Sequence, residues 1–316
     1  MSFKLPDGIP NLRTSAQDWA DYAEFLALCE IKVSLNSILK DPMLIDDELD
    51  INGIEDASDK YLSKTDEITA EIQLRINHLG EKYPFILLDN GYSIKLNDNI
   101  SLHSKIYKYL LLCTRIKMTG PAGSNRIING IDGALVFEFL CGEVSKNFFG
   151  ENTELDVFGT SKAAGSSFTA RLKSMINRLG EGRDANEYPV SKPQDDKVDL
   201  VVWKSSSDKN SSKFIGFGQC KTGTSWISKL SELDPDVFCK KWFHTTPIVN
   251  PIKMFFCAQY FPRNQWNFYA RSAGLIFDRF RIIEFLPENI DPSILEEIEN
   301  WYTGAEARYI TRTSAA

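Results

Sequence analysis

The sequence predicts a mixed α/β fold, in which a mainly helical N-terminal domain precedes a domain of helices and strands. Three observations favour this prediction. The composition is that of an ordinary globular chain, with 43% hydrophobic and 25% charged residues among 316. Apolar residues recur at helical spacing up to about residue 118, and later helices alternate with runs of β-branched and aromatic residues. A Gly-rich stretch separates the two regions, so we expect domains at 1–125 and 126–316.

The N-terminal domain contains three runs with apolar residues at helical spacing, residues 16–40, 65–83 and 101–118. Asp89-Asn90-Gly91 favours a tight turn, so we expect a short hairpin around these residues. The acidic run 43–59 predicts a solvated loop, with a ligand site as the alternative. Residues 1–110 carry 19 acidic and 11 basic side chains, which accounts for the formal net charge of −7. We expect this acidic domain to bind a partner or to regulate the other domain.

In the C-terminal domain the sequence predicts an alternation of helices and strands, which is typical of a mixed α/β sandwich. Residues 158–167 favour a loop of small residues. The charge beyond residue 110 is nearly balanced, so this part of the chain could still contact phosphates locally. The expected helices are 134–149, 168–182, 226–243, 264–274 and 291–304, and the expected strands are 197–204, 213–221, 252–261 and 275–287.

Several classes of protein are not favoured by the composition. No apolar run approaches the roughly 20 residues that span a bilayer, so we expect no membrane contact. The first residues, MSFKLPDGIPNLRTS, lack the pattern of a signal peptide, and we expect a cytoplasmic location. The six cysteines are scattered in apolar surroundings without a CxxC pair, which favours reduced thiols over a zinc site or disulfides.

Polar residues interrupt two of the expected strands. Asp199 lies in the run VDLVV, where its strand propensity is low, and Gln219 and Lys221 follow the apolar residues of FIGFGQCK. Because side chains alternate along a strand, Gln219 and Lys221 share one face. If Lys204 pairs with Phe214 in a hairpin, Asp199 lies opposite Gln219, whereas a slip of one residue would send Asp199 to the other face.

This combination of side chains suits hydrolysis of a phosphodiester. A carboxylate and an amide oxygen can bind Mg²⁺, which takes oxygen ligands, and the metal would activate a water molecule. Lys221 could orient that water or stabilise the transition state. The alternatives are structural: Asp199 could cap a turn, Gln219 could bond to the backbone, and Lys221 could mark the solvent-exposed end of a strand.

The segments VDLVVW and GFGQCKTG resemble the motif of the PD-(D/E)XK nuclease superfamily, in the variant of Mrr-like type IV restriction enzymes where glutamine replaces the second acid. The resemblance covers about residues 125–290. It implies a restriction-endonuclease-like αβββαβ core that needs Mg²⁺, or Mn²⁺ in its place, and cleaves DNA or, less often, RNA. By this resemblance Asp199 binds metal, Gln219 is the substituted acid and Lys221 is the catalytic lysine.

A metal-binding glutamate on the preceding helix is also implied by the resemblance. Glu138 and Glu143 are the candidates, and we prefer Glu138 because Ala134, Cys141 and Gly142 flank it with small side chains. The catalytic set is then Asp199, Gln219, Lys221 and Glu138, of which Asp199, Glu138 and Gln219 hold metal. Glutamine in place of an acid removes one negative charge, so we expect a single Mg²⁺.

Weaker candidates could contact nucleic acid. Trp226 could stack on a base, although an aromatic residue of the core is the alternative. Four residues could contact phosphates or belong to an ordinary polar loop: Ser161, Lys162, Ser167 and Arg171.

The expected function is therefore that of a Mg²⁺-dependent DNA endonuclease in restriction or antiviral defence. No GxxxxGK[ST] phosphate loop is present, so ATP-driven translocation would require another protein, and a protein partner or a homo-oligomer is expected. Two alternatives stay open. One is a ribonuclease, and the other is a non-catalytic, nuclease-like module that binds protein or nucleic acid.

Overall fold

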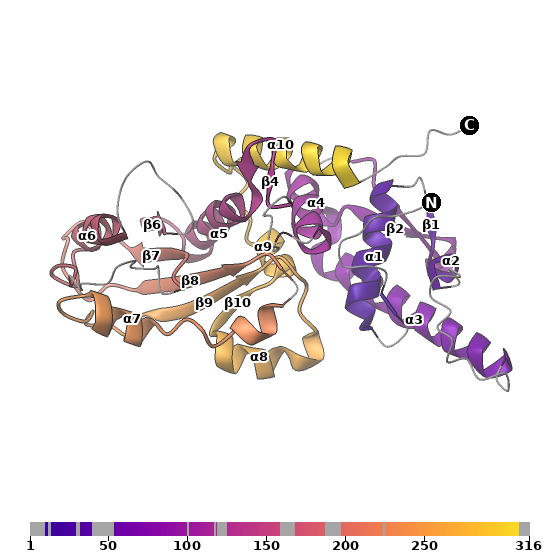
Figure 1. Cartoon of the computed structure of the whole chain (residues 1–316), viewed down its shortest axis with the longest axis horizontal. Coiled ribbons are helices and arrows are strands. Elements are labelled where there is room, and N and C mark those ends of the chain that lie inside the picture. The colour runs from indigo at the N-terminus through magenta and orange to yellow at the C-terminus, as the bar shows by residue number, and fades with distance from the viewer. Residues whose placement is uncertain are drawn as a thin grey trace. The chain divides into compact units, whose positions relative to one another are not determined.

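A computed structural model of the chain describes residues 10–11, 14–29, 32–39, 54–99, 101–116, 118, 125–158, 168–186, 197–223 and 225–309. Helices and sheets both occur in this part, as the mixed α/β prediction requires (Figure 1). By its internal contacts the chain divides into an N-terminal unit, Met1–Ile131 with Ile298–Ala316, and a C-terminal unit, Asp132–Glu297. The expected boundary lay between residues 125 and 126, and the expected second domain included the C-terminal segment that the contacts assign to the N-terminal unit.

The N-terminal unit packs helices on a small antiparallel sheet with strand order β1-β3-β2. Phe85 of β2 lies opposite Leu96 of β3, and Asp89-Asn90-Gly91 form the turn with positive φ angles of 51°, 56° and 96°, so the expected hairpin is confirmed. The elements are α1 Ala16–Cys29, β1 Val33–Ser34, α2 Leu35–Leu39, α3 Ile54–Leu79, β2 Phe85–Leu88, β3 Ser93–Leu96, α4 Leu102–Arg115, β4 Ile127–Ile128, β5 Ile131–Asp132 and most of α10 Pro292–Tyr309.

The single helix expected over residues 16–40 is instead two helices, α1 Ala16–Cys29 and α2 Leu35–Leu39, with strand β1 between them. There, Val33 and Ser34 pair with Ile94 and Ser93 of β3, because sheet pairing with a distant strand overrides local helical spacing. The expected acidic loop 43–59 is wrong from Ile54 onward, where helix α3 begins, and its residues 43–53 lie outside the described residues. At the other end of the chain, Trp301 of α10 is buried and donates a hydrogen bond from its indole to the carbonyl of Arg126 at 3.1 Å.

The C-terminal unit contains a five-stranded sheet in the order β10-β9-β8-β7-β6. Strand β7 is antiparallel to both of its neighbours, whereas β8, β9 and β10 run parallel. The elements are α5 Gly133–Phe149, β6 Thr153–Val157, α6 Phe168–Leu179, β7 Leu200–Lys204, β8 Ile215–Lys221, the 3₁₀ segment η4 Trp226–Lys229, α7 Pro235–Trp242, β9 Ile252–Cys257, α8 Trp266–Ala273, β10 Leu275–Phe277 and α9 Arg279–Glu284.

Three elements of this unit differ from the expectation. Strand β6 was not expected. The helix expected over 226–243 is two pieces, because Asp234 caps α7 by accepting hydrogen bonds from the amides of Asp236 and Val237. The strand expected over 275–287 ends at Phe277, since Asp278 caps a helix, α9, in the same way.

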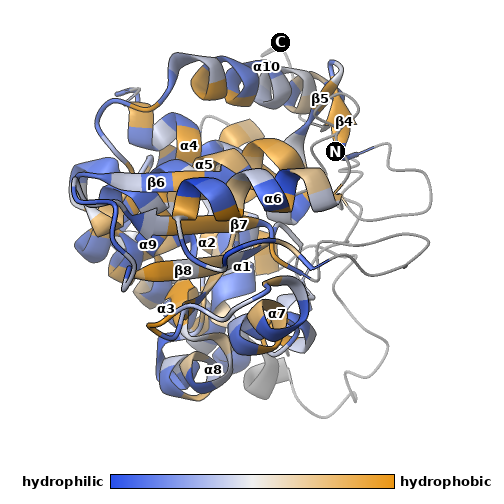
Figure 2. Ribbon diagram, turned by 90° about the vertical axis from the view of Figure 1, so that its left-hand side faces the viewer, coloured by the Kyte–Doolittle hydropathy of each residue, from blue (hydrophilic) through white to orange (hydrophobic). Residues whose placement is uncertain are grey.

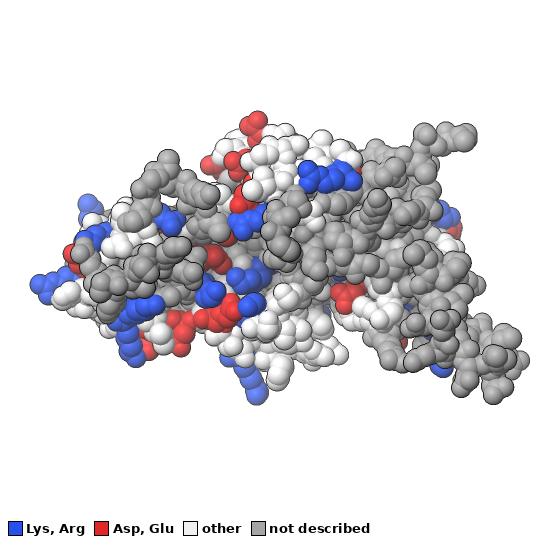
Figure 3. Space-filling model, in the orientation of Figure 1, with Lys and Arg blue, Asp and Glu red and all other residues white. Residues whose placement is uncertain are grey.

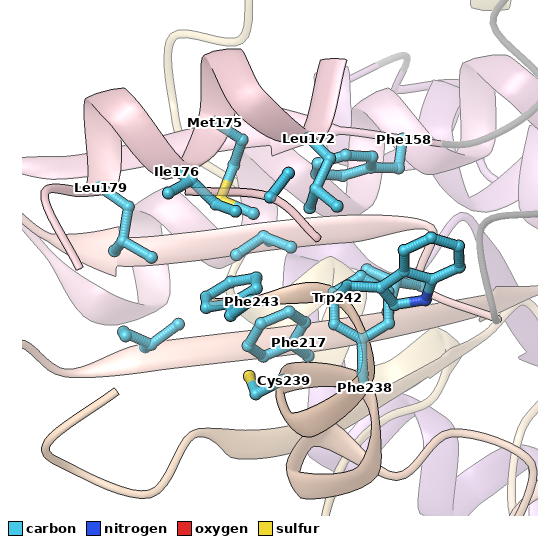
Figure 4. Close-up of a cluster of buried hydrophobic side chains, with 14 of the residues drawn as sticks. Phe158, Leu172, Met175, Ile176, Leu179, Phe217, Phe238, Cys239, Trp242 and Phe243 are labelled. Carbon is cyan, nitrogen blue, oxygen red and sulfur yellow. The ribbon is translucent and has the colours of Figure 1, made fainter. Parts of the chain in front are cut away.

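The central strands are buried on both faces. On one face, side chains of α6 and α7 enclose Phe217 of β8, and Figure 4 shows Leu172 and Met175 above Phe217 and Phe243. The apolar residues of β7 and β8 appear as the orange strands of Figure 2. On the other face α5 lies so close to β6 that a Cβ on Gly142 would come within 2.5 Å of Leu155. No described helix combines enough length with enough apolar character to cross a bilayer.

Candidate nuclease site

The hairpin of β7 and β8 has the register that was assumed from the sequence. The amide of Lys204 donates to the carbonyl of Phe214 at 3.0 Å, and Leu200 lies opposite Gly218. The regular pairing ends at Leu200, because the amide of Asp199 also donates to the carbonyl of Gly218, at 2.9 Å. The expected pairing of Asp199 with Gln219 is therefore not formed. Asp199 therefore lies directly before β7, beside the end of β8 that carries Gln219 and Lys221.

Asp199 and Lys221 form the accessible part of the site. Oδ2 of Asp199 accepts a hydrogen bond from the backbone amide of Cys220 at 2.6 Å and lies 4.0 Å from Nζ of Lys221. The side chain of Lys221 is 28% exposed and that of Asp199 is 12% exposed. A partly exposed cation thus lies close to a nearly buried carboxylate.

Gln219 is fully buried, and its amide has a fixed orientation. Nε2 donates a hydrogen bond to Oε2 of Glu232 at 3.1 Å. Because only the NH₂ group can donate to a carboxylate, the carbonyl oxygen Oε1 must point the other way. No hydrogen-bond partner for Oε1 exists among the described residues. Leaving such an acceptor buried and unsatisfied costs about 1–3 kcal/mol, and a ligand or a water molecule that reached Oε1 would remove this cost.

Glu232 is a site residue that sequence reasoning missed. It lies between η4 and α7 and bridges two side chains, since Oε1 accepts from Nζ of Lys229 at 2.6 Å while Oε2 accepts from Gln219. Burial alone would raise the pKa of Glu232, but the hydrogen bonds from Lys229 and Gln219 and the charges of Lys229 and Lys197 lower it below its ordinary value. Glu232 is therefore a carboxylate at neutral pH.

Glu138 reaches the same end of the sheet from α5. It is 7% exposed and lies one turn before Cys141, whose thiol interacts with that of Cys220. Burial first of all raises the pKa of both thiols, and the charges of Glu138 and Asp199 raise it further. The alternative, Glu143, instead pairs with Lys146 at 3.0 Å.

The residues that were expected to contact nucleic acid either have structural roles or lie outside the described residues. Ser161, Lys162 and Ser167 lie outside the described residues. Arg171 donates to the carbonyl of Phe158 at 2.8 Å, which fixes the backbone after β6. Trp226 is 4% exposed and stacks on Phe261 with ring centroids 3.7 Å apart. It is the core aromatic that was the alternative to a base-stacking residue.

The site offers oxygen donors of the kind that Mg²⁺ and Mn²⁺ prefer, namely the carboxylates of Asp199 and Glu138 and the amide oxygen of Gln219. Within the described ranges no three His, Cys, Asp or Glu side chains converge as a metal-binding group, and the third donor here is an amide. The unsatisfied Oε1 of Gln219 is the observation that fits a cation. In Figure 3 basic and acidic side chains lie next to each other where Figure 1 draws β8 to β10.

Comparisons with known proteins found no matching family model, no similar curated protein and no similar solved structure.

Proposed function

We propose that the chain is a Mg²⁺-dependent endonuclease that hydrolyses the phosphodiester bonds of DNA, with Mn²⁺ able to replace Mg²⁺. The observation that carries the proposal is the buried Oε1 of Gln219, an acceptor without a partner in the described chain. Gln219 lies on the same strand as Lys221, whose ammonium group is 4.0 Å from the carboxylate of Asp199. The NH₂ end of this amide is satisfied by Glu232, which leaves the oxygen end available to a ligand.

The order of the elements supports the proposal further. Helix α5, strands β6, β7 and β8, helix α7 and strand β9 follow one another, with α6 inserted between β6 and β7. This order agrees with the restriction-endonuclease-like αβββαβ core that the sequence motif implies, and β8 and β9 are parallel. A role in restriction or antiviral defence, with a protein partner or a second copy of the chain, belongs to the same proposal.

The residues of the site have distinct roles in the proposed reaction. Mg²⁺, when bound, would neutralise charge on the scissile phosphate and lower the pKa of a water molecule. Asp199, Glu138 and Gln219 would hold it through oxygen atoms. Lys221 would donate to a phosphate oxygen, because its ammonium group is accessible and already lies 4.0 Å from Asp199. The backbone amide of Cys220 keeps Asp199 turned toward Lys221.

Cleavage assays on the full chain test the proposal. Plasmid DNA and total RNA are incubated separately with Mg²⁺, with Mn²⁺ or with EDTA, and the variants Lys221→Ala and Asp199→Asn are tested in parallel. Cleavage of DNA that EDTA and both substitutions abolish is the expected result. Cleavage of RNA alone would identify a ribonuclease instead. If neither substrate is cut and no divalent ion binds, the chain is a binding module.

Lys146→Ala is a matched control, because it also removes a lysine from an ion pair in this unit. Its partner is Glu143 on α5, and its side chain is 44% exposed. We expect this variant to cleave DNA at the rate of the unmodified chain. Equal losses in Lys146→Ala and Lys221→Ala would contradict a specific role for Lys221.

A further inference from the structure

Glu232 and Lys229 together determine the orientation of the Gln219 amide. Lys229 donates to one carboxylate oxygen of Glu232, and Gln219 donates to the other. The two contacts are 2.6 Å and 3.1 Å long, and Gln219 is fully buried. Turning the Gln219 amide by half a rotation would place its carbonyl against the carboxylate of Glu232, where two acceptors repel.

The orientation matters because the two ends of an amide have opposite effects on a cation. The carbonyl oxygen is a ligand for a hard cation, whereas the NH₂ hydrogens repel one. A hydrogen bond from the NH₂ group to an anion also polarises the amide and makes its oxygen more negative. Glu232 thereby partly replaces the negative charge that an acidic residue at position 219 would have and that Gln219 lacks.

We infer that Glu232 is the positioning residue of the metal site, which holds Gln219 with its carbonyl oxygen toward a divalent cation. The inference rests on the proposed function, because it assigns the direction of one proposed ligand. Residues that orient a metal ligand commonly change metal affinity by about 10- to 100-fold when they are replaced.

The variant Glu232→Gln tests the inference because Lys229 stays in place. Lys229 would donate to the oxygen of the new glutamine, whose NH₂ group would then face Gln219. The Gln219 amide must turn to accept that hydrogen bond, and its own NH₂ group then points into the site. We expect Mn²⁺ binding, measured by electron paramagnetic resonance on the full chain without nucleic acid, to weaken at least about 10-fold.

A second substitution should reverse the loss. In the double variant Glu232→Gln with Lys229→Met, the new glutamine is free to turn its oxygen toward Gln219, and Mn²⁺ binding should return to within about threefold of the unmodified chain. A merely structural role for Glu232 predicts the opposite, since the double variant has lost one more contact. Glu143→Gln is the matched control, because Glu143 also pairs with a lysine three residues away, and it should leave Mn²⁺ binding unchanged.

The outcomes separate this inference from the proposed function. Unchanged Mn²⁺ affinity in Glu232→Gln, or a double variant that binds no more tightly than the single one, would overturn the positioning role alone. An unmodified chain that binds no Mn²⁺ would overturn both. If Glu232→Gln does not fold, a crystal structure of the unmodified chain with Mn²⁺ decides: Oε1 of Gln219 facing the ion supports the inference, and Nε2 facing it overturns the inference.

Discussion

Oδ2 of Asp199 accepts a hydrogen bond from the backbone amide of Cys220, with 2.6 Å between the two atoms. The contact joins the residue before β7 to the second-last residue of β8. It explains how a carboxylate is kept beside Lys221. It also separates the structural contribution of Asp199 from its charge, because an asparagine can accept the same hydrogen bond without being a carboxylate.

Two substitutions at Asp199 should therefore differ in stability and agree in activity. Asp199→Asn is expected to change the free energy of unfolding by less than about 1 kcal/mol, whereas Asp199→Ala leaves the amide of Cys220 unpaired and should cost about 1–3 kcal/mol. Both should abolish Mg²⁺-dependent cleavage. Urea denaturation and the plasmid assay measure the two effects, and an active Asp199→Asn variant would contradict the assignment of this carboxylate.

Gly218 has no room for a side chain. A Cβ at this position would lie 2.7 Å from Cδ1 of Leu200 and 3.1 Å from the ring of Phe256. We expect Gly218→Ala to destabilise the C-terminal unit by about 1–3 kcal/mol in thermal or urea unfolding, as overpacking of a core does. Gly223→Ala is the control, since nothing lies within 4 Å of its Cβ position. Equal stability of the two variants would contradict this account of the packing.

Arg75 of α3 is the centre of a buried ion network in the N-terminal unit. Its guanidinium group contacts Asp21 at 2.6 Å, Glu24 at 2.8 Å and Glu71 at 2.9 Å. Removing one partner of such a network leaves uncompensated charge, so Arg75→Met should lower the free energy of unfolding by about 3–5 kcal/mol. Hydrogen exchange should speed up in α1 and α3.

The matched control for Arg75 is Lys64→Met on the same helix. Lys64 pairs with Glu67, whose side chain is 54% exposed, and exposed pairs contribute only about 0–1 kcal/mol. A loss in Arg75→Met as small as that in Lys64→Met would show that the buried network contributes little.

The cysteines should be unreactive in the folded chain. Burial, followed by the charge of Asp236, raises the pKa of Cys239 to about 12, and burial raises the pKa of Cys257 as well. Each thiol therefore keeps its proton at pH 8. Because the thiol pKa is higher in the folded chain than in the unfolded chain, the associated stability is fully present below the ordinary pKa of about 9 and is lost only as the pH rises beyond it. All six cysteines are buried.

Ellman's reagent at pH 8 measures the reactivity of these thiols. It should react slowly with the native chain and quickly with six thiols after urea is added. Rapid reaction of Cys239 before unfolding, located by mass spectrometry, would contradict its burial.

Much of the β7–β8 hairpin could be predicted from sequence because two simple rules act there. Side chains alternate on a strand, and the apolar faces of neighbouring strands must coincide, so the pairing of Lys204 with Phe214 could be expected, and it brings Asp199 to the end of β8. The helices around the sheet followed from apolar spacing in the same way. These regularities are local, and they needed no knowledge of the tertiary structure.

The parts that could not be predicted depend on tertiary contacts. Glu232 meets Gln219 only because the segment between η4 and α7 passes over the end of β8, and no spacing in the sequence indicates this. Strand β6 has a half-exposed, polar sequence at the edge of the sheet, so its pattern resembles a loop. Trp226 follows a polar motif, but Phe261 covers its ring.

The assignment of residues 298–316 to the N-terminal unit has a practical consequence for dissecting the protein. The polypeptide enters and leaves the C-terminal unit once each, so the latter is an insertion between two segments of the former. Truncating only the first 131 residues would leave Trp301 without Tyr109, against which its ring packs at 5.3 Å, and an uncovered indole promotes aggregation. A clean excision keeps residues 132–297 and removes both flanking segments.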